Sequence, residues 1–317
     1  EQTRDWVLIF DEAFEVGRAN KSMSDVFGWE NEELALANGI PGITRARTEY
    51  YRKLLPIILR KGHWRGEELI TTPNGKKYHV IINISVSVNI EHQKTHFICV
   101  YTDITAQKSA EDELRIMANY DHLTGLPNRT LLLDRIAHAT ASSRRSKEPI
   151  ALFFIDLDRF KQINDSLGHE CGDLLLKEVS KRLVTSMRAD DTLARIGGDE
   201  FVALLERFRS ANELAGIAQK FINLVQHPFT LNNNVVSIGA SIGISLFPDD
   251  AESSEELFRN ADVAMYHAKQ LGRNNYQFFT DHMNEEAKQR LEKETNLKLA
   301  FANEEFFNAY QPIIDAY

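Results

Sequence analysis

The sequence predicts an α+β domain followed by an α/β domain whose central sheet is mostly antiparallel and flanked by helices. A chain of 317 residues with 43% hydrophobic residues is long enough for roughly two packed domains. Between residues 80 and 88, apolar side chains alternate with mostly polar or small ones, as in a half-buried antiparallel strand. Further on, the apolar run Ile150–Ile155 predicts a buried strand, and the adjacent Gly197 and Gly198 predict a tight hairpin.

The first predicted domain covers residues 1–106. Trp6–Phe10 is a short candidate strand, and a helix is expected from about Asn20 to Phe27. Pro73-Asn74-Gly75-Lys76 predicts the hairpin turn before the alternating strand. Phe97–Val100 predicts one more strand.

That segment ends in Asp103-Ile104-Thr105, and the whole pattern resembles a PAS sensor domain with its Asp-Ile-Thr exit. The resemblance implies sensing, but it names no ligand. Cys99 lies outside a flavin-photosensor motif, and the histidines of the segment lack a spacing typical of haem ligation. The PAS ligand is therefore unknown, and the alternatives are an unidentified small molecule or a role in dimerisation.

A linker helix is predicted at residues 107–118. Ala110, Leu114 and Met117 fall at i, i+4 and i+7, which gives one apolar stripe. Two interpretations stay open, because one heptad does not separate them: a helix packed on its own domain, or a short parallel coiled coil joining two subunits.

The next domain is predicted to cover residues 119–281. Helical stripes at 176–187 and 214–221 would pack on a sheet that includes the strand 150–155. From Val236 to Leu246, larger apolar residues alternate with serine and glycine. One face of that strand is expected to be core, and the other to allow close approach by another element.

Carboxylates cluster where two of these elements end. Asp156 follows the buried strand, and Asp199 and Glu200 follow the two glycines. If the strands are neighbours, Asp156 and Asp199 converge, and such hard oxygen ligands suit Mg²⁺ (or Mn²⁺) bound together with a nucleotide phosphate. Asp158 is expected to cap the helix that follows, whose first N–H groups would face those phosphates.

Five ordered signatures across residues 119–281 resemble a GGDEF domain, the catalytic domain of diguanylate cyclases. They are Asp121–Arg129, Phe154–Asp173, Arg195–Phe201, Ser241–Ser245 and Ala261–Asn274. The resemblance implies a palm-like fold in which two GTP become cyclic di-GMP and two pyrophosphates. Each domain would hold one GTP, so catalysis would need a homodimer.

The resemblance also implies a role for each matching residue. Asp156, Asp199 and the Leu157 carbonyl would be metal ligands, and Glu200 a further ligand or the catalytic base. The residues implied to bind substrate are Phe160, Asn164, Asp173, Gly198, Lys269 and Arg273. Among them, Asn164 and Asp173 would read guanine, which offers N–H donors beside an acceptor. Lys269 and Arg273 would hold the terminal phosphates, although cations near a helix end are also expected from capping alone.

Arg188 and Asp191 form an Arg-x-x-Asp pattern with five residues between Asp191 and Gly197. This spacing resembles the family's inhibitory site, where the product binds. Arginine can grip guanine or phosphate through two donors, and aspartate can accept from guanine. The alternative is an ordinary surface ion pair.

The net charge and the cysteines limit the class of binding partner and the cellular location that we expect. A net charge of −9 argues against nucleic acid as a partner. Two cysteines in different domains fit a reducing, cytoplasmic location, and no apolar run is long enough for a membrane segment. The chain begins at Glu1, which indicates a piece of a longer protein that could itself be membrane-anchored.

The tail, residues 282–317, is predicted to be a charged linker helix from Glu285 to Asn303 followed by a truncated domain. Its segment Phe306–Asp315 resembles the opening strand of an EAL phosphodiesterase domain. The leading hypothesis is a product-inhibited diguanylate cyclase under PAS control. The alternatives are a catalytically silent GTP-binding module of a GGDEF–EAL phosphodiesterase and a cyclic di-GMP receptor.

Overall fold

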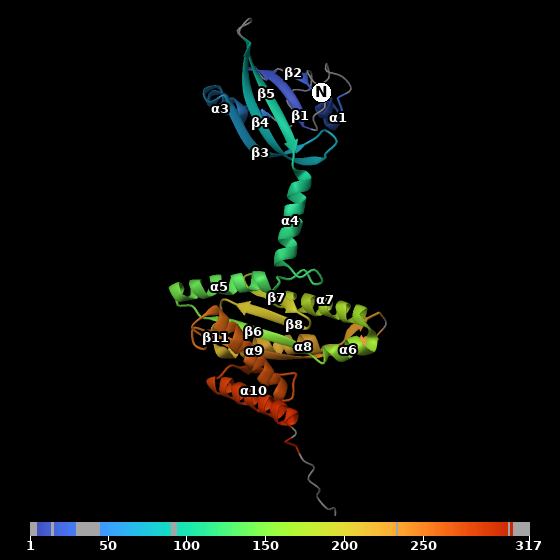
Figure 1. Ribbon diagram of the computed structural model, residues 1–317, viewed down its shortest axis with the longest axis vertical. Helices are drawn as coiled ribbons and strands as arrows, with labels where there is room; N and C mark the ends of the chain where they lie inside the picture. Colours follow the sequence, from blue (N-terminus) through green and yellow to red (C-terminus); the bar gives the residue numbers. More distant parts are fainter. Residues whose placement is uncertain are drawn as a thin grey trace, which may run out of the picture. The chain divides into compact units, whose positions relative to one another are not determined.

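The computed structural model describes residues 5–13, 16–29, 45–89, 94–232, 234–303 and 305–306 (Figure 1). The chain divides into two compact units, Glu1–Arg115 and Ile116–Tyr317. Beyond Phe306, the strand expected at 306–315 lies outside the described residues. In the part of the chain that is described, no helix has both the length and the apolar composition needed to cross a membrane.

The first unit is built on an antiparallel five-stranded sheet in the order β2-β1-β5-β4-β3. The expected alternation is confirmed, since Val80, Ile82 and Ile84 of the fourth strand are buried. Asn20 caps the first helix by accepting from the Met23 amide. The elements of this unit are β1 (Trp6–Asp11), β2 (Val16–Ala19), α1 (Lys21–Phe27), α3 (Arg45–Lys61), β3 (His63–Thr71), β4 (Lys77–Asn89) and β5 (Lys94–Asp103).

Helix α4 (Thr105–Asn119) is the expected linker helix, and none of its residues is buried. Leu114 and Met117 are 66% and 71% exposed. The stripe therefore does not pack into a core of the described structure.

The second unit has a five-stranded sheet in the order β12-β11-β6-β8-β7, in which only the pairing of β11 with β12 is parallel. This confirms the expected mostly antiparallel sheet with flanking helices. Its strands are β6 (Ile150–Asp158), β7 (Thr192–Gly197), β8 (Glu200–Leu205), β11 (Gly239–Phe247) and β12 (Tyr276–Phe278), beside a separate hairpin of β9 (Phe229–Leu231) and β10 (Asn234–Val236). Its helices are α5 (Arg129–Ser146), α6 (Phe160–Leu167), α7 (His169–Thr185), α8 (Ala211–Gln226), α9 (Ser254–Gln270) and α10 (Asp281–Ala302).

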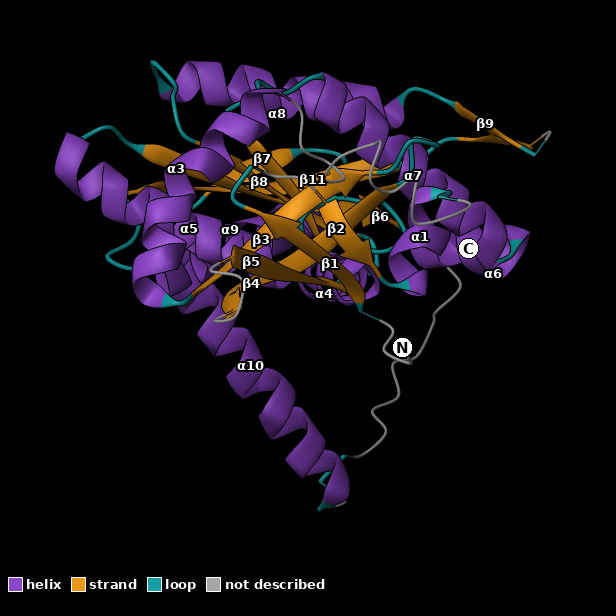
Figure 2. Ribbon diagram, turned by 90° about the horizontal axis from the view of Figure 1, so that it is seen from above, coloured by secondary structure: helices purple, strands orange, loops and turns teal. Residues whose placement is uncertain are grey.

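Helices cover both faces of this sheet, and α8 and α9 lie on opposite sides of it in Figure 2. On one face, Phe153 and Ile155 of β6 share a core with residues of α7 and α8. On the other, Leu152 and Phe154 share a core with residues of α5 and α9. Because β6 is buried on both faces, it reads as a continuous apolar run.

Three expected boundaries were wrong. Strand β6 continues to Asp158, because Asp156 and Asp158 still pair with Ser241 and Gly239 of β11. The strand expected from Val236 begins only at Gly239, since Val236 belongs to the hairpin with β9. Finally, α10 begins at Asp281, four residues before the expected start at Glu285.

Candidate active site

The hairpin between β7 and β8 presents Asp199 and Glu200, as expected from its two glycines. Gly198 adopts a φ of 51°, a left-handed conformation that glycine reaches without steric penalty. The guanidinium of Arg195 donates from Nε and Nη2 to the Gly198 carbonyl at 3.0 and 2.8 Å. The tip is therefore held in one conformation by a side chain of its own first strand.

The neighbouring strand brings Asp156 to the same place. Asp156 stands opposite Glu200 in the ladder between β6 and β8, and the Leu157 amide donates to the Asp199 carbonyl at 3.2 Å. The expected convergence of the strand end and the hairpin is thus confirmed. This arrangement gathers three carboxylates and a short stretch of backbone at one end of the neighbouring strands β6 and β8.

Burial and mutual repulsion shift the pKa values of these carboxylates. Burial raises the pKa of Asp156 to about 6, with repulsion from Asp199 and Asp158 in the same direction. The Lys269 ammonium, 2.6 Å from Asp156 Oδ2, opposes that rise. Burial and the nearby Asp262 and Asp199 also raise the pKa of Glu200. Negative charge of this density calls for a cation.

The donor set suits a hard cation that keeps open positions. In the described part of the chain, no three His, Cys, Asp or Glu side chains form a metal centre by themselves. Mg²⁺ does not need one, because it is usually bound by one or two carboxylates with phosphate oxygens and water. The oxygens of Asp156, Asp199, Glu200 and the Leu157 carbonyl fit that pattern.

Helices α6 and α7 supply a second polar feature. Asn164 Oδ1 is buried and has no hydrogen-bond partner in the structure. It reaches this position because Gly172 has no side chain, and a Cβ there would overlap it. Asp173 follows Gly172 and is exposed, while Phe160 is buried under the same helix pair. An unsatisfied buried amide oxygen is costly alone, which favours a ligand with N–H donors at this point.

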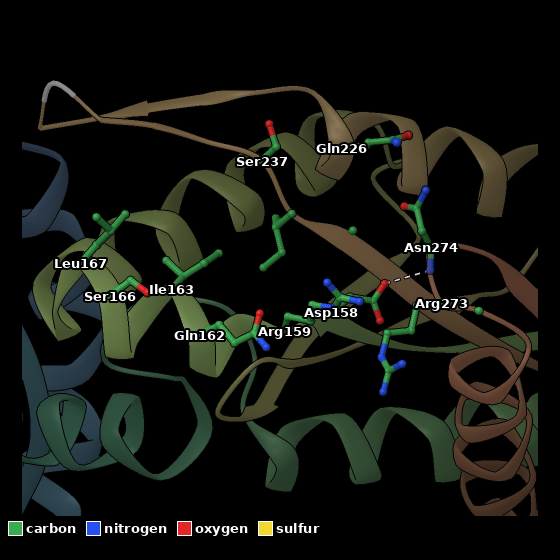
Figure 3. Close-up of a pocket in the computed structure, with 13 residues that line it drawn as sticks. Asp158, Arg159, Gln162, Ile163, Ser166, Leu167, Gln226, Ser237, Arg273 and Asn274 are labelled. Carbon is green, nitrogen blue, oxygen red and sulfur yellow. Dashed lines mark hydrogen bonds between the residues drawn. The ribbon is translucent and has the colours of Figure 1, made fainter. Parts of the chain in front are cut away.

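Arg273 and Asp158 meet at a groove of about 700 Å³ (Figure 3). Arg273 lies on the loop between α9 and β12 with a φ of 65°. Asp158 does not cap α6, contrary to expectation: Arg159 occupies the cap position, and no side chain bonds there. Asp158 instead stays in the strand and accepts from Ser241 Oγ at 2.7 Å and the Asn274 amide at 2.9 Å.

Arg188 and Asp191 lie together in the loop before β7. The Arg188 amide donates to Asp191 Oδ2 at 3.1 Å. The exposed guanidinium of Arg188 donates to Glu213 Oε1 and to the Arg207 carbonyl, both at 2.9 Å. Any anion bound by Arg188 would therefore compete with Glu213.

Sequence reasoning gave no role to a largely buried ion pair that supports the hairpin. Arg195 Nη1 donates to both carboxylate oxygens of Asp121 at 3.0 Å, across 74 positions of sequence. The two side chains are 10% and 14% exposed. The pair ties the Asp-His-Leu-Thr signature to the hairpin, and only the three-dimensional structure reveals it.

Asp121→Asn is expected to destabilise the second unit by about 1.5–3 kcal/mol, the range for a hydrogen bond to a charged group. Burial alone would raise the Asp121 pKa, but hydrogen bonds from Thr124 and Arg195 outweigh it and lower the pKa. A lowered pKa stabilises the fold above the ordinary carboxyl range, and that contribution is lost as pH falls through the native pKa. Denaturation of both proteins from pH 7 to 3 should therefore give curves that converge below about pH 4. An unchanged gap at pH 3 would contradict the ion-pair assignment.

Comparison with known proteins identifies the family to which the second unit is similar. The family described as "Diguanylate cyclase, GGDEF domain" matches residues 118–275. The bifunctional diguanylate cyclase/cyclic di-GMP phosphodiesterase MucR of Pseudomonas aeruginosa is 44% identical over 208 residues, 66% of this chain and 30% of MucR. The cyclic di-GMP phosphodiesterase PdeR of Escherichia coli is 33% identical over 311 residues, 97% of this chain and 46% of PdeR.

A solved structure gives the same result. The GGDEF domain of TpbB (YfiN) from P. aeruginosa superposes with a TM-score of 0.52 and 37% sequence identity, covering 53% of this chain and 99% of that one. This chain spans less than half the length of MucR and of PdeR. The family match and the near-complete coverage of the TpbB domain show that the chain belongs to the GGDEF family of diguanylate cyclase domains.

Proposed function

We propose that this chain condenses two GTP molecules into cyclic di-GMP and two pyrophosphates. The observation that carries the proposal is the hairpin with Asp199 and Glu200 held against Asp156 at the end of β6. The orphaned Asn164 Oδ1 supports guanine as the base, because guanine offers N–H donors that an amide oxygen accepts.

In this proposal the protein acts mostly by positioning and charge. Asn164 and Asp173 bind guanine, and the side chain of Phe160 packs beneath that pocket. Gly198 lets the nucleotide lie close to the hairpin. Asp156, Asp199 and the Leu157 carbonyl hold Mg²⁺ or Mn²⁺, which when bound neutralises charge on the phosphate oxygens. Glu200 either completes that cation site or accepts the proton of the attacking 3′-hydroxyl.

Lys269 and Arg273 bind the terminal phosphates. The ammonium of Lys269 pairs with Asp156 at 2.6 Å. When Asp156 serves as a cation ligand, Lys269 would be free to turn toward the terminal phosphates.

The proposed organisation is a PAS sensor at 1–106, a linker helix at 107–118, a catalytic GGDEF domain at 119–281, and the start of an EAL domain within 282–317. The strand order β2-β1-β5-β4-β3 supports the PAS assignment. The exposed Leu114 and Met117 support pairing of two linker helices. Such a homodimer would bring two GTP-loaded domains together, as the reaction requires.

Incubating the chain with GTP and Mg²⁺ at several protein concentrations, then separating nucleotides by anion exchange, tests this function. A cyclic di-GMP peak that grows faster than linearly with protein concentration is expected, because two domains must meet. GTP left intact at every concentration, with GTP binding still measurable, would overturn the proposed activity.

One comparison favours a second candidate function. PdeR, which is similar over 97% of this chain, is named a cyclic di-GMP phosphodiesterase. The chain would then be a GTP-binding or cyclic di-GMP-binding regulatory part of a GGDEF–EAL phosphodiesterase. Binding of GTP without turnover in the same experiment would favour this alternative.

Arg188→Ala is expected to abolish product binding at the proposed inhibitory site and to raise turnover at late times. Arg188 supplies the guanidinium, and Asp191 beside it would accept from guanine. Calorimetric titration with cyclic di-GMP and a progress curve check the two effects. Glu213→Gln is the matched variant, since it weakens the competing ion pair and should tighten product binding. Unchanged inhibition in Arg188→Ala would refute this site.

A further inference from the structure

Asp158 has strong contacts but no role in the proposed mechanism so far. It is a carboxylate with 7% exposure at the end of β6. Its two hydrogen bonds reach far along the sequence, to Ser241 on β11 and to the backbone of Asn274. Figure 3 shows the bond from Asn274 and the side chain of Arg273 projecting from the same loop. A buried charge is retained at a cost, so its contacts need a reason.

The loop that Asp158 contacts has an unusual backbone. Gly272, Arg273 and Asn274 have φ values of 113°, 65° and 49° in succession. Non-glycine residues rarely adopt positive φ, and two in a row persist only where the surroundings impose them. The conformation that presents Arg273 therefore depends on contacts made by the loop.

Those contacts fall into local and distant ones. Locally, the Arg273 amide and Asn275 Nδ2 both donate to the Ala268 carbonyl, at 3.2 and 2.9 Å. From a distance, Asp158 Oδ2 accepts from Asn274, and Gly239 leaves the room for it: a Cβ there would lie 2.9 Å from Asp158 Oδ2. Asp158 thus ties the loop directly to β6.

The same strand also holds the other end of this segment. Asp156 and Asp158 are two positions apart, so their side chains leave the same face of β6. Asp156 pairs with Lys269, which precedes the positive-φ turn, and Asp158 accepts from Asn274, the last residue of that turn. Two carboxylates of one strand therefore grip the segment that carries both proposed phosphate-binding cations.

We propose that Asp158 is a positioning residue for GTP binding, which aligns Arg273 with the terminal phosphates by fixing the Asn274 backbone. This inference rests on the proposed function, in which Arg273 binds those phosphates. Loss of Asp158 frees the loop to leave its strained conformation, and the guanidinium then no longer stays where the phosphates lie. The hydrogen bonds of Asp158 reach β11 and the loop after α9, so guanine binding between α6 and α7 is expected not to depend on them.

The test compares two ligands that share guanine but differ in phosphates. The first is guanosine 5′-[α,β-methylene]triphosphate, which cannot release pyrophosphate, and the second is GMP. Asp158→Ala is expected to weaken the triphosphate analogue at least about tenfold, as for loss of a hydrogen bond to a charged group. GMP affinity should stay within about twofold of the unaltered protein.

Two further substitutions separate positioning from mere structural support. Asp158→Asn should restore most of the triphosphate affinity, because its amide oxygen accepts from Asn274 while its Nδ2 donates to Ser241 Oγ. Ser241→Ala is the milder variant to use if Asp158→Ala does not fold. It should weaken binding of the analogue about threefold without changing GMP affinity. Asp249→Asn, an exposed carboxylate in a turn, is the control and should change neither affinity.

A double-mutant cycle then asks whether Asp158 acts through Arg273. Asp158→Ala should add almost nothing to the loss already caused by Arg273→Ala. Additive losses, or an equal loss of GMP affinity in Asp158→Ala, would overturn the positioning role. If Arg273→Ala alone leaves analogue affinity unchanged, Arg273 does not bind the terminal phosphates. That result would refute the proposed phosphate assignment and, with it, the positioning role of Asp158.

Discussion

Asp199→Ala is expected to lower the rate of cyclic di-GMP formation by about a thousandfold or more, with cyclic di-GMP binding at Arg188 unchanged. Charge stabilisation at phosphate oxygens is worth several kcal/mol, and each 1.36 kcal/mol is about tenfold in rate. Asp199 lies on the hairpin beside Asp156, so its loss removes one of the few carboxylates able to fix a cation there. Initial rates with GTP and Mg²⁺, together with calorimetric product titration, measure both effects.

Asp134→Ala on α5 is the matched control for this loss of one carboxylate. Asp134 is an exposed residue whose described contact is a 3.7 Å pair with His138. Its rate should stay within about twofold, because exposed pairs contribute little. More than a tenth of the original rate in Asp199→Ala would show that the cation is held elsewhere. Loss of product binding in the same variant would instead show that the hairpin and the loop of Arg188 are coupled.

Much of this site could be predicted from the sequence because its signals are local. Two adjacent glycines between apolar runs specify a hairpin, and an apolar run followed by aspartate specifies a strand with a carboxylate near its end. The structure confirms both elements and pairs Asp156 with Glu200. Whether the two strands are neighbours was left open by the sequence, and the structure shows that they are.

The features that sequence reasoning missed depend on contacts between distant residues. Asp158 resembles a helix cap because aspartate precedes a helix, yet its partners lie 83 and 116 positions away. Arg195 pairs with Asp121 across 74 positions. Asp262 has no special pattern, although its charge acts on Glu200. A polar side chain near an element boundary can bond to local backbone groups or to distant residues. Only the tertiary structure decides between them.

The packing of α9 on β11 is tighter than the sequence pattern alone indicates. The serine and glycine face of β11 was expected to allow close approach, and α9 lies directly against it at Gly243. A Cβ on Gly243 would overlap the Ala261 carbonyl oxygen and the Met265 amide nitrogen. These are backbone atoms of a helix, so no side-chain rotation relieves the clash.

Gly243→Ala is therefore expected to destabilise the second unit by about 3 kcal/mol or more, the upper range for overpacking a core. At roughly 2–4 °C per kcal/mol, calorimetry should show a melting transition lower by about 6–12 °C. Gly216→Ala on α8 is the matched control, because its added Cβ meets no atom within 4 Å. It should stabilise the helix by about 0.5–1 kcal/mol. A tolerated Gly243→Ala would mean that α9 can move away from the sheet.

Such a movement would also change the active site, since α9 carries Lys269 to within 2.6 Å of Asp156 on β6. Folded Gly243→Ala protein should therefore bind the methylene GTP analogue more weakly than Gly216→Ala does. The small residues of β11 then have a functional consequence as well as a structural one. They set the spacing between the strand that holds the acidic groups and the helix that supplies the cation, and a single methyl group is enough to change it.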